Sequence, residues 1–249
     1  MSALRAKCPD CRTLTAVAIG PEYQCHSCGR EFAAGLVRVP RAWGAGGEAM
    51  AAAATMALPW PEAATIDEPT LERQVSALAR ELPARPLVLG GCCCAHVGAV
   101  RELARRHGRL GVVWIDAHGD LNTPESSPSG NAWGMPLRML IDAGDVAACD
   151  VTLLGARNLD PPEVEFIRQS GIHEQLGELP ERVYVALDCD VFEPGSLDVF
   201  MPERGGSSPA GLEPLLASIP APAGAGLTGL LGSERNEAIL PRLARALGF

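Results

Sequence analysis

The sequence predicts an α/β protein, a three-layer, doubly wound parallel sheet preceded by a small cysteine-rich ribbon. Short aliphatic runs alternate with amphipathic stretches along most of the chain, and two Cys-x-x-Cys pairs stand near its beginning. The aliphatic runs are apolar throughout, as in strands buried on both faces, which are typical of parallel sheets. We expect two domains, a ribbon over residues 1–33 and an α/β domain over residues 34–249.

The composition excludes several classes of protein. With 47% hydrophobic and 20% charged residues, the 249-residue chain can bury a large core and is not disordered. The 30 acidic and 21 basic residues give a net charge of −9, so we expect no nucleic-acid partner. The apolar stretches fall far short of the roughly 20 residues that span a bilayer, and the first residues lack an apolar signal region. We therefore expect no membrane contact and a cytoplasmic location.

The first four cysteines form a metal-binding pattern. Cys8 and Cys11 make one Cys-x-x-Cys pair, and Cys25 and Cys28 make a second pair after thirteen intervening residues. This spacing lets four thiolates meet around one ion, as in a zinc ribbon, and leaves no coordination position open. We expect one structural Zn²⁺ here, with a role in folding or docking.

The elements of the α/β domain follow in order. Buried strands are expected over the apolar runs at 36–39, 86–91, 110–116, 151–155, 183–188 and 226–231. Amphipathic helices are expected between them, at 68–82 and at about 96–107, 134–147, 161–170, 209–218 and 237–247. This alternation is what predicts the doubly wound sheet.

Metal-binding side chains gather where three of these strands end. Ligands bind beyond the carboxyl ends of parallel strands, and residues two positions apart at a strand end face the same side. Carboxylates packed together need a divalent cation to offset their repulsion, and oxygen ligands with one imidazole favour manganese. The candidates are Asp116, His118, Asp120, Asp188, Asp190 and the cysteines at 92–94.

These motifs resemble those of the arginase and agmatinase ureohydrolases over most of the chain after residue 35. Asp-Ala-His-Gly-Asp at 116–120 is similar to the family's D-A-H-x-D, Asp-Cys-Asp at 188–190 is similar to its D-x-D, and Gly-Gly-Cys-Cys at 90–93 stands where G-G-D-H is usual. The resemblance implies a two-manganese centre that hydrolyses guanidino groups. It assigns bridging roles to Asp116 and Asp188, the first metal to Asp120 and Cys93, and the second metal to His118 and Asp190.

The resemblance extends to substrate recognition. One loop is similar to the arginase segment that holds the α-carboxylate of an amino acid, which implies that role for Asn122, Ser129 and Asn131. A later stretch looks like the segment that contacts the α-amino group, which implies that role for Asp160 and Glu163. Without the family, Asn122 and Ser129 are ordinary loop residues and Asp160 is a helix N-cap.

Several positions depart from the family pattern. Cys93 replaces a histidine ligand, and its softer thiolate opens the first site to zinc, iron or cobalt. His96 is expected to be a helix residue rather than a replacement ligand. Trp133 stands where arginases keep a histidine thought to carry protons; its indole does not titrate, but its face can bind a cationic substrate. Glu234 resembles the glutamate that pairs with the guanidinium and, with Asp120, is a candidate catalytic residue; the alternative is an exposed carboxylate at a helix start.

We therefore expect a manganese-dependent ureohydrolase acting on arginine or a derivative such as N-hydroxyarginine, with release of urea or hydroxyurea. Two alternatives stay open. One is a hydrolase of another guanidine or amidine, such as agmatine, guanidinobutyrate or formiminoglutamate. The other is a metal-binding pseudoenzyme that docks through its ribbon, which Cys93 and Trp133 support. Family members are commonly trimers or hexamers, so a homo-oligomer is open for this chain.

Overall fold

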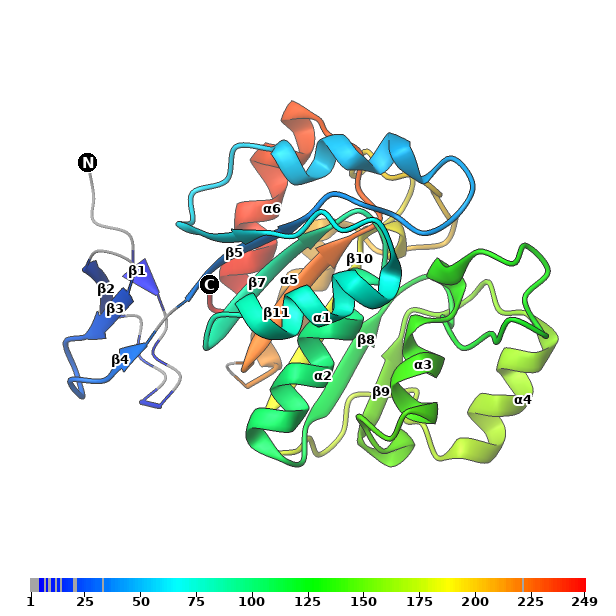
Figure 1. Cartoon of the computed structure of the whole chain (residues 1–249), viewed down its shortest axis with the longest axis horizontal. Coiled ribbons are helices and arrows are strands. Elements are labelled where there is room, and N and C mark those ends of the chain that lie inside the picture. The colour runs from blue at the N-terminus through cyan, green and yellow to red at the C-terminus, as the bar shows by residue number, and fades with distance from the viewer. Residues whose placement is uncertain are drawn as a thin grey trace.

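The described chain forms two separate sheets, a 4-stranded antiparallel sheet and a 7-stranded parallel sheet (Figure 1). The structure is a computed structural model, and it describes residues 5–6, 8, 10–11, 13, 15–19, 22–32, 34–220 and 222–249. Residue 33, the expected end of the ribbon, lies outside the described residues, so the domain boundary stays a prediction.

The small sheet contains the N-terminal cysteines. Its strands follow the order β1-β2-β3-β4 and comprise β1 (Arg5–Ala6), β2 (Ala16–Ile19), β3 (Glu22–Cys25) and β4 (Glu31–Phe32). The rings of Tyr23 and Phe32 stack at 5.7 Å beside the buried Cys8, Ala16 and Cys25. A core of this size is too small to be stable without a further constraint such as a metal ion.

The large sheet has the strand order β6-β5-β7-β11-β10-β8-β9, and every pair in it is parallel. Its strands are β5 (Ala34–Val39), β6 (Glu62–Thr65), β7 (Arg85–Gly90), β8 (Gly111–Ile115), β9 (Val151–Leu154), β10 (Val183–Asp188) and β11 (Gly224–Thr228). The edge strand β6 was not expected, because its sequence, Glu-Ala-Ala-Thr, is mostly exposed and lacks an apolar run. The last strand begins and ends earlier than the predicted 226–231.

Six α-helices are assigned within the described residues. They are α1 (Leu71–Glu81), α2 (Ala95–His107), α3 (Pro136–Asp142), α4 (Pro161–Ser170), α5 (Pro209–Ser218) and α6 (Glu234–Ala246). Short 3₁₀ helices are η1 (Gly47–Thr55), η2 (Ala132–Gly134), η3 (Ala148–Asp150) and η4 (Cys189–Val191). α3 is shorter than the predicted 134–147, because Gly144 takes a φ of 73° soon after the helix ends. None of the described helices has the length and apolar character needed to cross a membrane.

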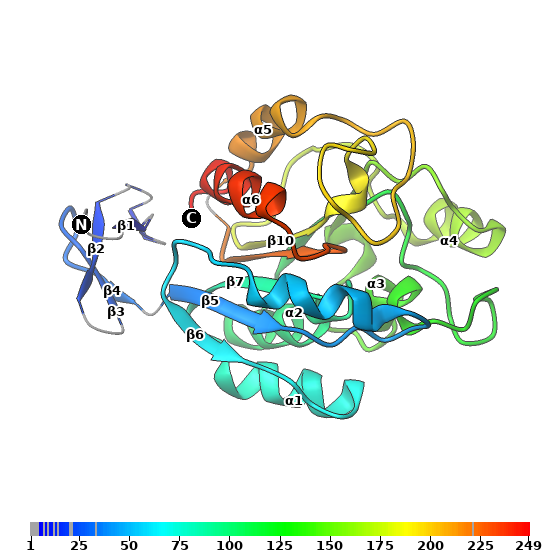
Figure 2. The ribbon, with the colours of Figure 1, turned by 90° about the horizontal axis from the view of Figure 1, so that it is seen from above.

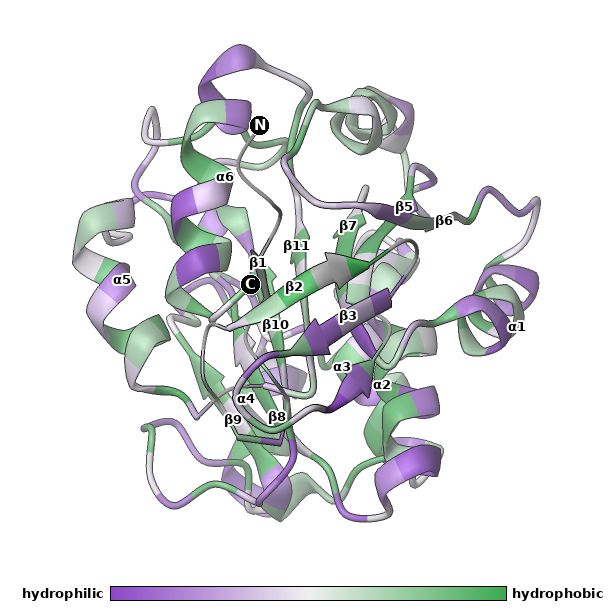
Figure 3. Cartoon of the chain, turned by 90° about the vertical axis from the view of Figure 1, so that its left-hand side faces the viewer, coloured by the Kyte–Doolittle hydropathy of each residue, from purple (hydrophilic) through white to green (hydrophobic). Residues whose placement is uncertain are grey.

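The helices cover both faces of the large sheet, which confirms the predicted three layers (Figure 2). Successive residues of β10 show how: Tyr184 and Ala186 pack toward α1 to α4, whereas Val185 and Leu187 pack toward α5, α6 and η1. Because both faces of the strand are buried, its sequence reads as a continuous apolar run. Figure 3 shows the same division in the large sheet, where strands such as β7 and β10 are largely hydrophobic and the helices alternate hydrophobic and hydrophilic residues.

The two sheets are joined end to end. Phe32 closes β4, and Ala34 opens β5, so the small sheet lies beside the N-terminal edge of the large one (Figure 1). At this edge the guanidinium of the buried Arg85 lies 3.9 Å from the ring centroid of Phe249 and donates to the carbonyl of Gly248. The carboxyl ends of the parallel strands point to the opposite edge.

Candidate metal centre

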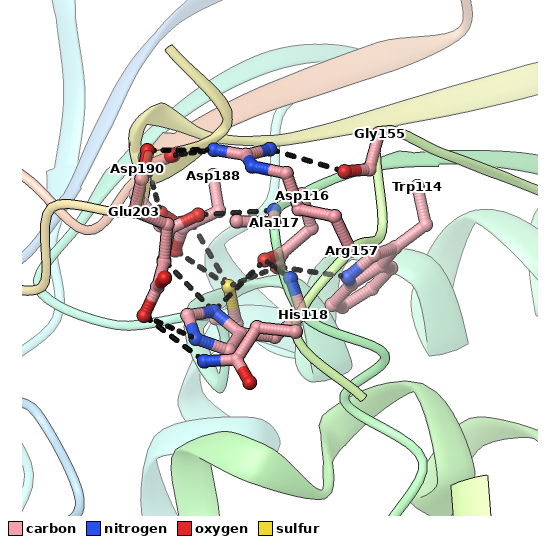
Figure 4. Close-up of polar contacts among 12 residues, drawn as sticks. Trp114, Asp116, Ala117, His118, Gly155, Arg157, Asp188, Asp190 and Glu203 are labelled. Atoms are coloured by element: carbon pink, nitrogen blue, oxygen red, sulfur yellow. Dashed lines mark hydrogen bonds and ion pairs between the residues drawn. The ribbon is translucent and has the colours of Figure 1, made fainter. Parts of the chain in front are cut away.

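Neighbouring strands of the large sheet deliver the predicted ligands to one place (Figure 4). Asp116 directly follows β8, Asp188 is the last residue of β10, and Cys93 lies three residues beyond β7. Because parallel strands end at the same edge, their last residues converge there. The turn of η4 then brings the backbone N–H of Asp190 within 3.0 Å of Asp188 Oδ1.

Two groups of possible ligand atoms share one residue. Cys93, Asp116 and Asp120 offer three atoms that all lie within 4.8 Å of one another, and Asp116, His118 and Asp190 offer three more. Asp116 belongs to both groups, so its carboxylate is placed to bridge two ions. Asp188 joins the first group through its Oδ2, which lies 2.9 Å from Cys93 Sγ. The structure thus brings all six predicted ligands together.

The pKa values of three clustered carboxyl groups are raised. Burial and the charge of Asp190 raise the pKa of Asp188 to about 7, and burial and the charge of Asp116 raise the pKa of Asp190 to about 6. Burial and the charge of Asp116 also raise the pKa of Asp120 well above its usual range. Burial opposes the charged form of His118, but Asp116 and Asp190 outweigh it and raise its pKa to about 12. A divalent cation beside these carboxyl groups would favour their ionised form.

The Asp120 side chain supports the fit of a divalent cation. Its Oδ2 is buried, and no hydrogen-bond partner is found for it among the described residues. Its φ of 53° is the only positive value among the described residues other than glycine. A left-handed backbone costs most residues about 1–2 kcal/mol, although aspartate tolerates it better. An unpaired carboxylate oxygen in a cluster of acids is what a hard cation such as Mn²⁺ or Mg²⁺ would bind.

Hydrogen bonds from buried groups orient the ligand candidates. Asp116 Oδ2 accepts from the indole of Trp114 at 3.2 Å, and its Oδ1 accepts from the backbone N–H of His118 at 2.7 Å. Asp190 Oδ1 accepts from the backbone N–H of Ala117 at 3.1 Å (Figure 4). His118 Nδ1 lies 3.0 Å from Asp190 Oδ2. Such supports fix the direction in which each ligand points.

A second support was missed by the sequence analysis. Arg157 donates to the backbone carbonyls of Asp190 and Glu203, at 3.0 and 2.9 Å, and ties the loop that carries Glu203 to the strand ends (Figure 4). Glu203 Oε1 accepts from Asn158 Nδ2 at 3.0 Å and lies 3.6 Å from His118 Nε2. These contacts join segments far apart in the chain, so local patterns could not reveal them.

The metal-ligand groups lie at the floor of a cavity of about 240 Å³. All the predicted substrate-binding residues line it, together with apolar and polar residues that the sequence analysis did not select. The residues lining it besides the ligands include Met50, Phe200, Met201, Trp133, Asn122, Ser127, Ser129, Asn131, Asn158, Asp160 and Glu163. No lysine or arginine is found among the described residues of the lining. The cavity therefore suits a cationic ligand.

Several of the polar lining residues also hold the loops in place. Asn122 donates through Nδ2 to Asp160 Oδ2 at 2.8 Å, and its Oδ1 accepts from the hydroxyl of Ser126, also at 2.8 Å. Glu163 is buried, and its two oxygens accept from the backbone N–H groups of Leu121 and Asp160, both at 2.9 Å. Burial raises the pKa of Glu163 despite these bonds. The loop and helix-cap roles considered as alternatives are thus present, whatever further role these residues have.

Trp133 forms the apolar wall of the cavity. Its ring meets that of Phe200 edge to face, with centroids 5.6 Å apart. On the other side it packs against the backbone of Gly44, where an added Cβ would lie 2.4 Å from the indole. Asn131 closes this corner, since its Oδ1 accepts from the N–H of Ala45 at 3.0 Å. The indole is therefore fixed against the cavity.

Glu234 does not reach the cavity. It is exposed at the first position of α6, which Ser233 caps by accepting from the N–H of Asn236. The buried Asn236 of the same Glu-Arg-Asn stretch anchors the loop instead, with donations to Leu231 and Asp198 carbonyls at 2.7 and 2.8 Å. The structure thus corresponds to the alternative of an exposed carboxylate at a helix start, because the strand ends before this segment.

The four N-terminal cysteines form a separate cluster. All four Sγ atoms lie within 4.8 Å of one another, with Cys8 and Cys28 3.6 Å apart and Cys11 and Cys25 3.5 Å apart. Tetrahedral zinc with sulfur ligands places neighbouring sulfurs about 3.8 Å apart. The group is therefore compatible with the structural zinc that the spacing predicts.

Known proteins share both the sequence and the fold. The family model "Arginase family" matches residues 49–227. The arginase of Bacillus caldovelox is 38% identical over 141 residues, which cover 44% of this chain and 47% of that protein. The arginase of Staphylococcus aureus (strain COL) is 43% identical over 112 residues, which cover 41% of this chain and 37% of that protein. The aligned part of the chain thus spans less than half the length of these curated relatives.

Solved structures extend the likeness to most of the chain. The arginase of Bacillus cereus superposes with a TM-score of 0.69 at 25% identity, covering 87% of this chain and 98% of that one. The formimidoylglutamase of Bacillus subtilis superposes with a TM-score of 0.65 at 15% identity, covering 86% and 84%, and so shows the fold alone. Since the family model matches well over half of the residues, the chain belongs to the arginase family.

Proposed function

We propose that this chain is a binuclear metallohydrolase of a guanidino group, carried by arginine or by a derivative such as N-hydroxyarginine. The observation that carries the proposal is that Asp116, which lines the cavity, belongs to both groups of clustered ligand atoms. Two ions held by a shared carboxylate are typical of hydrolases in which the ions activate a water molecule and orient a polar substrate.

Cys93, Asp120 and Asp188 would hold one ion with Asp116, and His118 and Asp190 would complete the site of the other. The family resemblance implies that Asp188, like Asp116, would be shared by the two ions. Mn²⁺ suits both groups, and the Cys93 thiolate also suits a softer ion such as zinc or cobalt. When bound, the two ions supply an activated water and stabilise developing negative charge. The cavity walls hold the substrate over them.

The lining favours a cationic, planar group. The acidic floor has no lysine or arginine beside it among the described lining residues, and the indole of Trp133 offers a face for a guanidinium. Asp160 and Glu163, for which the family resemblance implies contact with an α-amino group, line the same cavity. These features support an amino acid with a guanidino side chain.

A second candidate is a metal-binding protein without turnover. It is favoured by the exposed position of Glu234, which leaves the guanidinium without its expected carboxylate partner, and by Trp133, which cannot transfer a proton. In this reading the four-cysteine ribbon, with one Zn²⁺, would dock the chain on a partner.

One experiment separates these functions. Purified protein, with its ribbon loaded with zinc, is reloaded with Mn²⁺ and assayed for urea or hydroxyurea with L-arginine, N-hydroxy-L-arginine, agmatine and guanidinobutyrate. Turnover of either amino acid is the expected result. Turnover of agmatine or guanidinobutyrate alone would assign a different guanidine substrate, and two bound metals with no product from any of the four would favour the second candidate.

A further inference from the structure

A line of buried polar side chains runs from the metal-ligand candidates into the core. The hydroxyl of Thr228, at the end of β11, lies 3.3 Å from Cys93 Sγ and donates to Asp188 Oδ2 at 3.1 Å. His96, in the first turn of α2, places Nε2 3.2 Å from Thr228 Oγ1. Its Nδ1 lies 3.0 Å from the hydroxyl of Tyr184 in β10. Three elements of the fold thus contribute to one connected network.

The fold provides dedicated space for this network. Thr228, His96 and Tyr184 have no exposed surface. A Cβ at Gly226 would lie 2.6 Å from both the His96 ring and the Tyr184 hydroxyl, so only glycine fits there. On its other side the His96 ring meets Trp114 edge to face, with centroids 5.2 Å apart. A polar ring enclosed in this way stays in place only with both nitrogens hydrogen-bonded.

The hydrogen bonds that lead from Tyr184 through His96 and Thr228 to Asp188 have one consistent set of directions. Thr228 has a single hydroxyl proton and donates it to Asp188, so it must accept from His96 Nε2–H. Burial lowers the pKa of His96 to about 3, so its ring is neutral and carries one proton. His96 Nδ1 is then an acceptor for the Tyr184 hydroxyl. All the donors therefore point toward the metal-ligand candidates.

A cysteine ligand needs this help more than a histidine ligand does. A histidine bound to a metal is oriented through its second ring nitrogen, which hydrogen-bonds to a neighbouring group. Cys93 has one polar side-chain atom, so a partner that orients it must contact the sulfur itself. The Thr228 hydroxyl is within reach of that sulfur and of Asp188 at the same time.

We propose that Thr228 and His96 are positioning residues for the metal centre: His96, held by Tyr184, fixes the Thr228 hydroxyl, which donates to Asp188 and packs against the Cys93 sulfur. This inference rests on the metal-holding part of the proposed function and is independent of the substrate. It also explains why His96 lies next to the ligand segment without being a ligand, since both of its nitrogens are engaged elsewhere.

Manganese binding tests the proposal without any assay of turnover. The full chain, with its four-cysteine group first loaded with Zn²⁺, is titrated with Mn²⁺, and unbound Mn²⁺ is measured by electron paramagnetic resonance. Thr228→Val and His96→Leu are each expected to raise the Kd for Mn²⁺ by about 10-fold to 100-fold. Thr228→Ser keeps the hydroxyl and should bind like the wild type. Thr152→Val, at a buried threonine of β9 outside the network, is the matched control and should leave the Kd unchanged.

A milder variant and a spectrum guard against misfolding. Tyr184→Phe removes only the donor to His96 Nδ1, and we expect it to raise the Kd in the same direction by a smaller factor. Nitrogen NMR of the wild type should show the His96 proton on Nε2. The inference is wrong if folded Thr228→Val or Tyr184→Phe binds Mn²⁺ as the wild type does, or if the proton is on Nδ1. If the wild type itself binds no Mn²⁺, the proposed metal centre is wrong as well.

Discussion

The Sγ atom of Cys93 lies 2.9 Å from Oδ2 of Asp188, although the two residues are 95 positions apart in the chain. At this distance a thiol proton can bridge the two atoms, whereas a thiolate beside a carboxylate would be repelled. Burial and the charge of Asp188 accordingly raise the pKa of Cys93 well above its usual range. A cation that replaces this proton would turn the pair into two ligands.

Removal of the shared carboxylate should abolish both metal sites. Asp116→Ala takes one ligand from each group, so we expect the loss of both Mn²⁺ ions and of turnover, measured by metal analysis and urea release. Asp142→Ala, at an exposed aspartate paired with Arg138, is the control and should change neither quantity. Full metal content in Asp116→Ala would contradict the assignment.

Replacement of the thiol should change metal preference. Cys93→His exchanges a soft ligand for a harder one, so the affinity for Mn²⁺ relative to Zn²⁺ should rise by about 10-fold or more. Competition between the two ions in equilibrium dialysis measures this ratio. An unchanged ratio would mean that Cys93 does not contact the metal.

The stabilisation conferred by metal should grow with pH. The raised pKa values of Asp188, about 7, and Asp190, about 6, mean that the folded metal-free chain holds protons that the unfolded chain releases above about pH 4. The stability of the metal-free chain should therefore fall as the pH rises from about 4 to 7. Bound metal replaces these protons, so the Tm difference between loaded and metal-free protein should increase from pH 5 to pH 8. An increase that persists unchanged in Asp188→Asn would point to other groups.

Loss of a ribbon cysteine should reduce stability and spare the chemistry. Cys8→Ser removes one of four clustered thiols, so we expect loss of the bound zinc and a lower Tm, with kcat unchanged in the protein that remains folded. Cys149→Ser, at an exposed cysteine outside the four-cysteine cluster, is the matched control. A selective fall in kcat would place the ribbon in the active site.

The position of the Trp133 indole should depend on Gly44, which packs against it. Gly44→Ala would place a methyl group 2.4 Å from Trp133, so the indole must move, and we expect kcat/KM to fall by up to about 100-fold while metal content stays constant. Gly177→Ala, at a glycine outside the cavity with open space around the added methyl group, is the control and should have little effect. Equal kinetics for the two variants would show that the position of Trp133 does not matter for the substrate.

The sequence predicted those parts of the fold and site for which a local residue pattern has a known physical cause. The strand β10 and its Asp-x-Asp ending were predictable, because a strand buried on both faces is apolar throughout and its end marks the ligand edge. The edge strand β6 was not predictable, since its exposed residues carry no such pattern. For Glu234 the pattern was misleading. The matching Glu-Arg-Asn tripeptide does not establish where the preceding strand ends, and β11 ends well before it. The role of Thr228 depends on contacts between distant segments, which periodicity does not report.

The four-cysteine ribbon and the cavity lie at opposite edges of one sheet, since the ribbon continues into the start of β5 and the ligands follow the ends of β7, β8 and β10 (Figure 1). The two edges of the sheet are therefore free to serve different purposes. A partner bound to the ribbon would contact the chain at the edge of the sheet that lies away from the ligand candidates. Attachment to a larger assembly and access of small molecules to the cavity would then use different surfaces and would not compete.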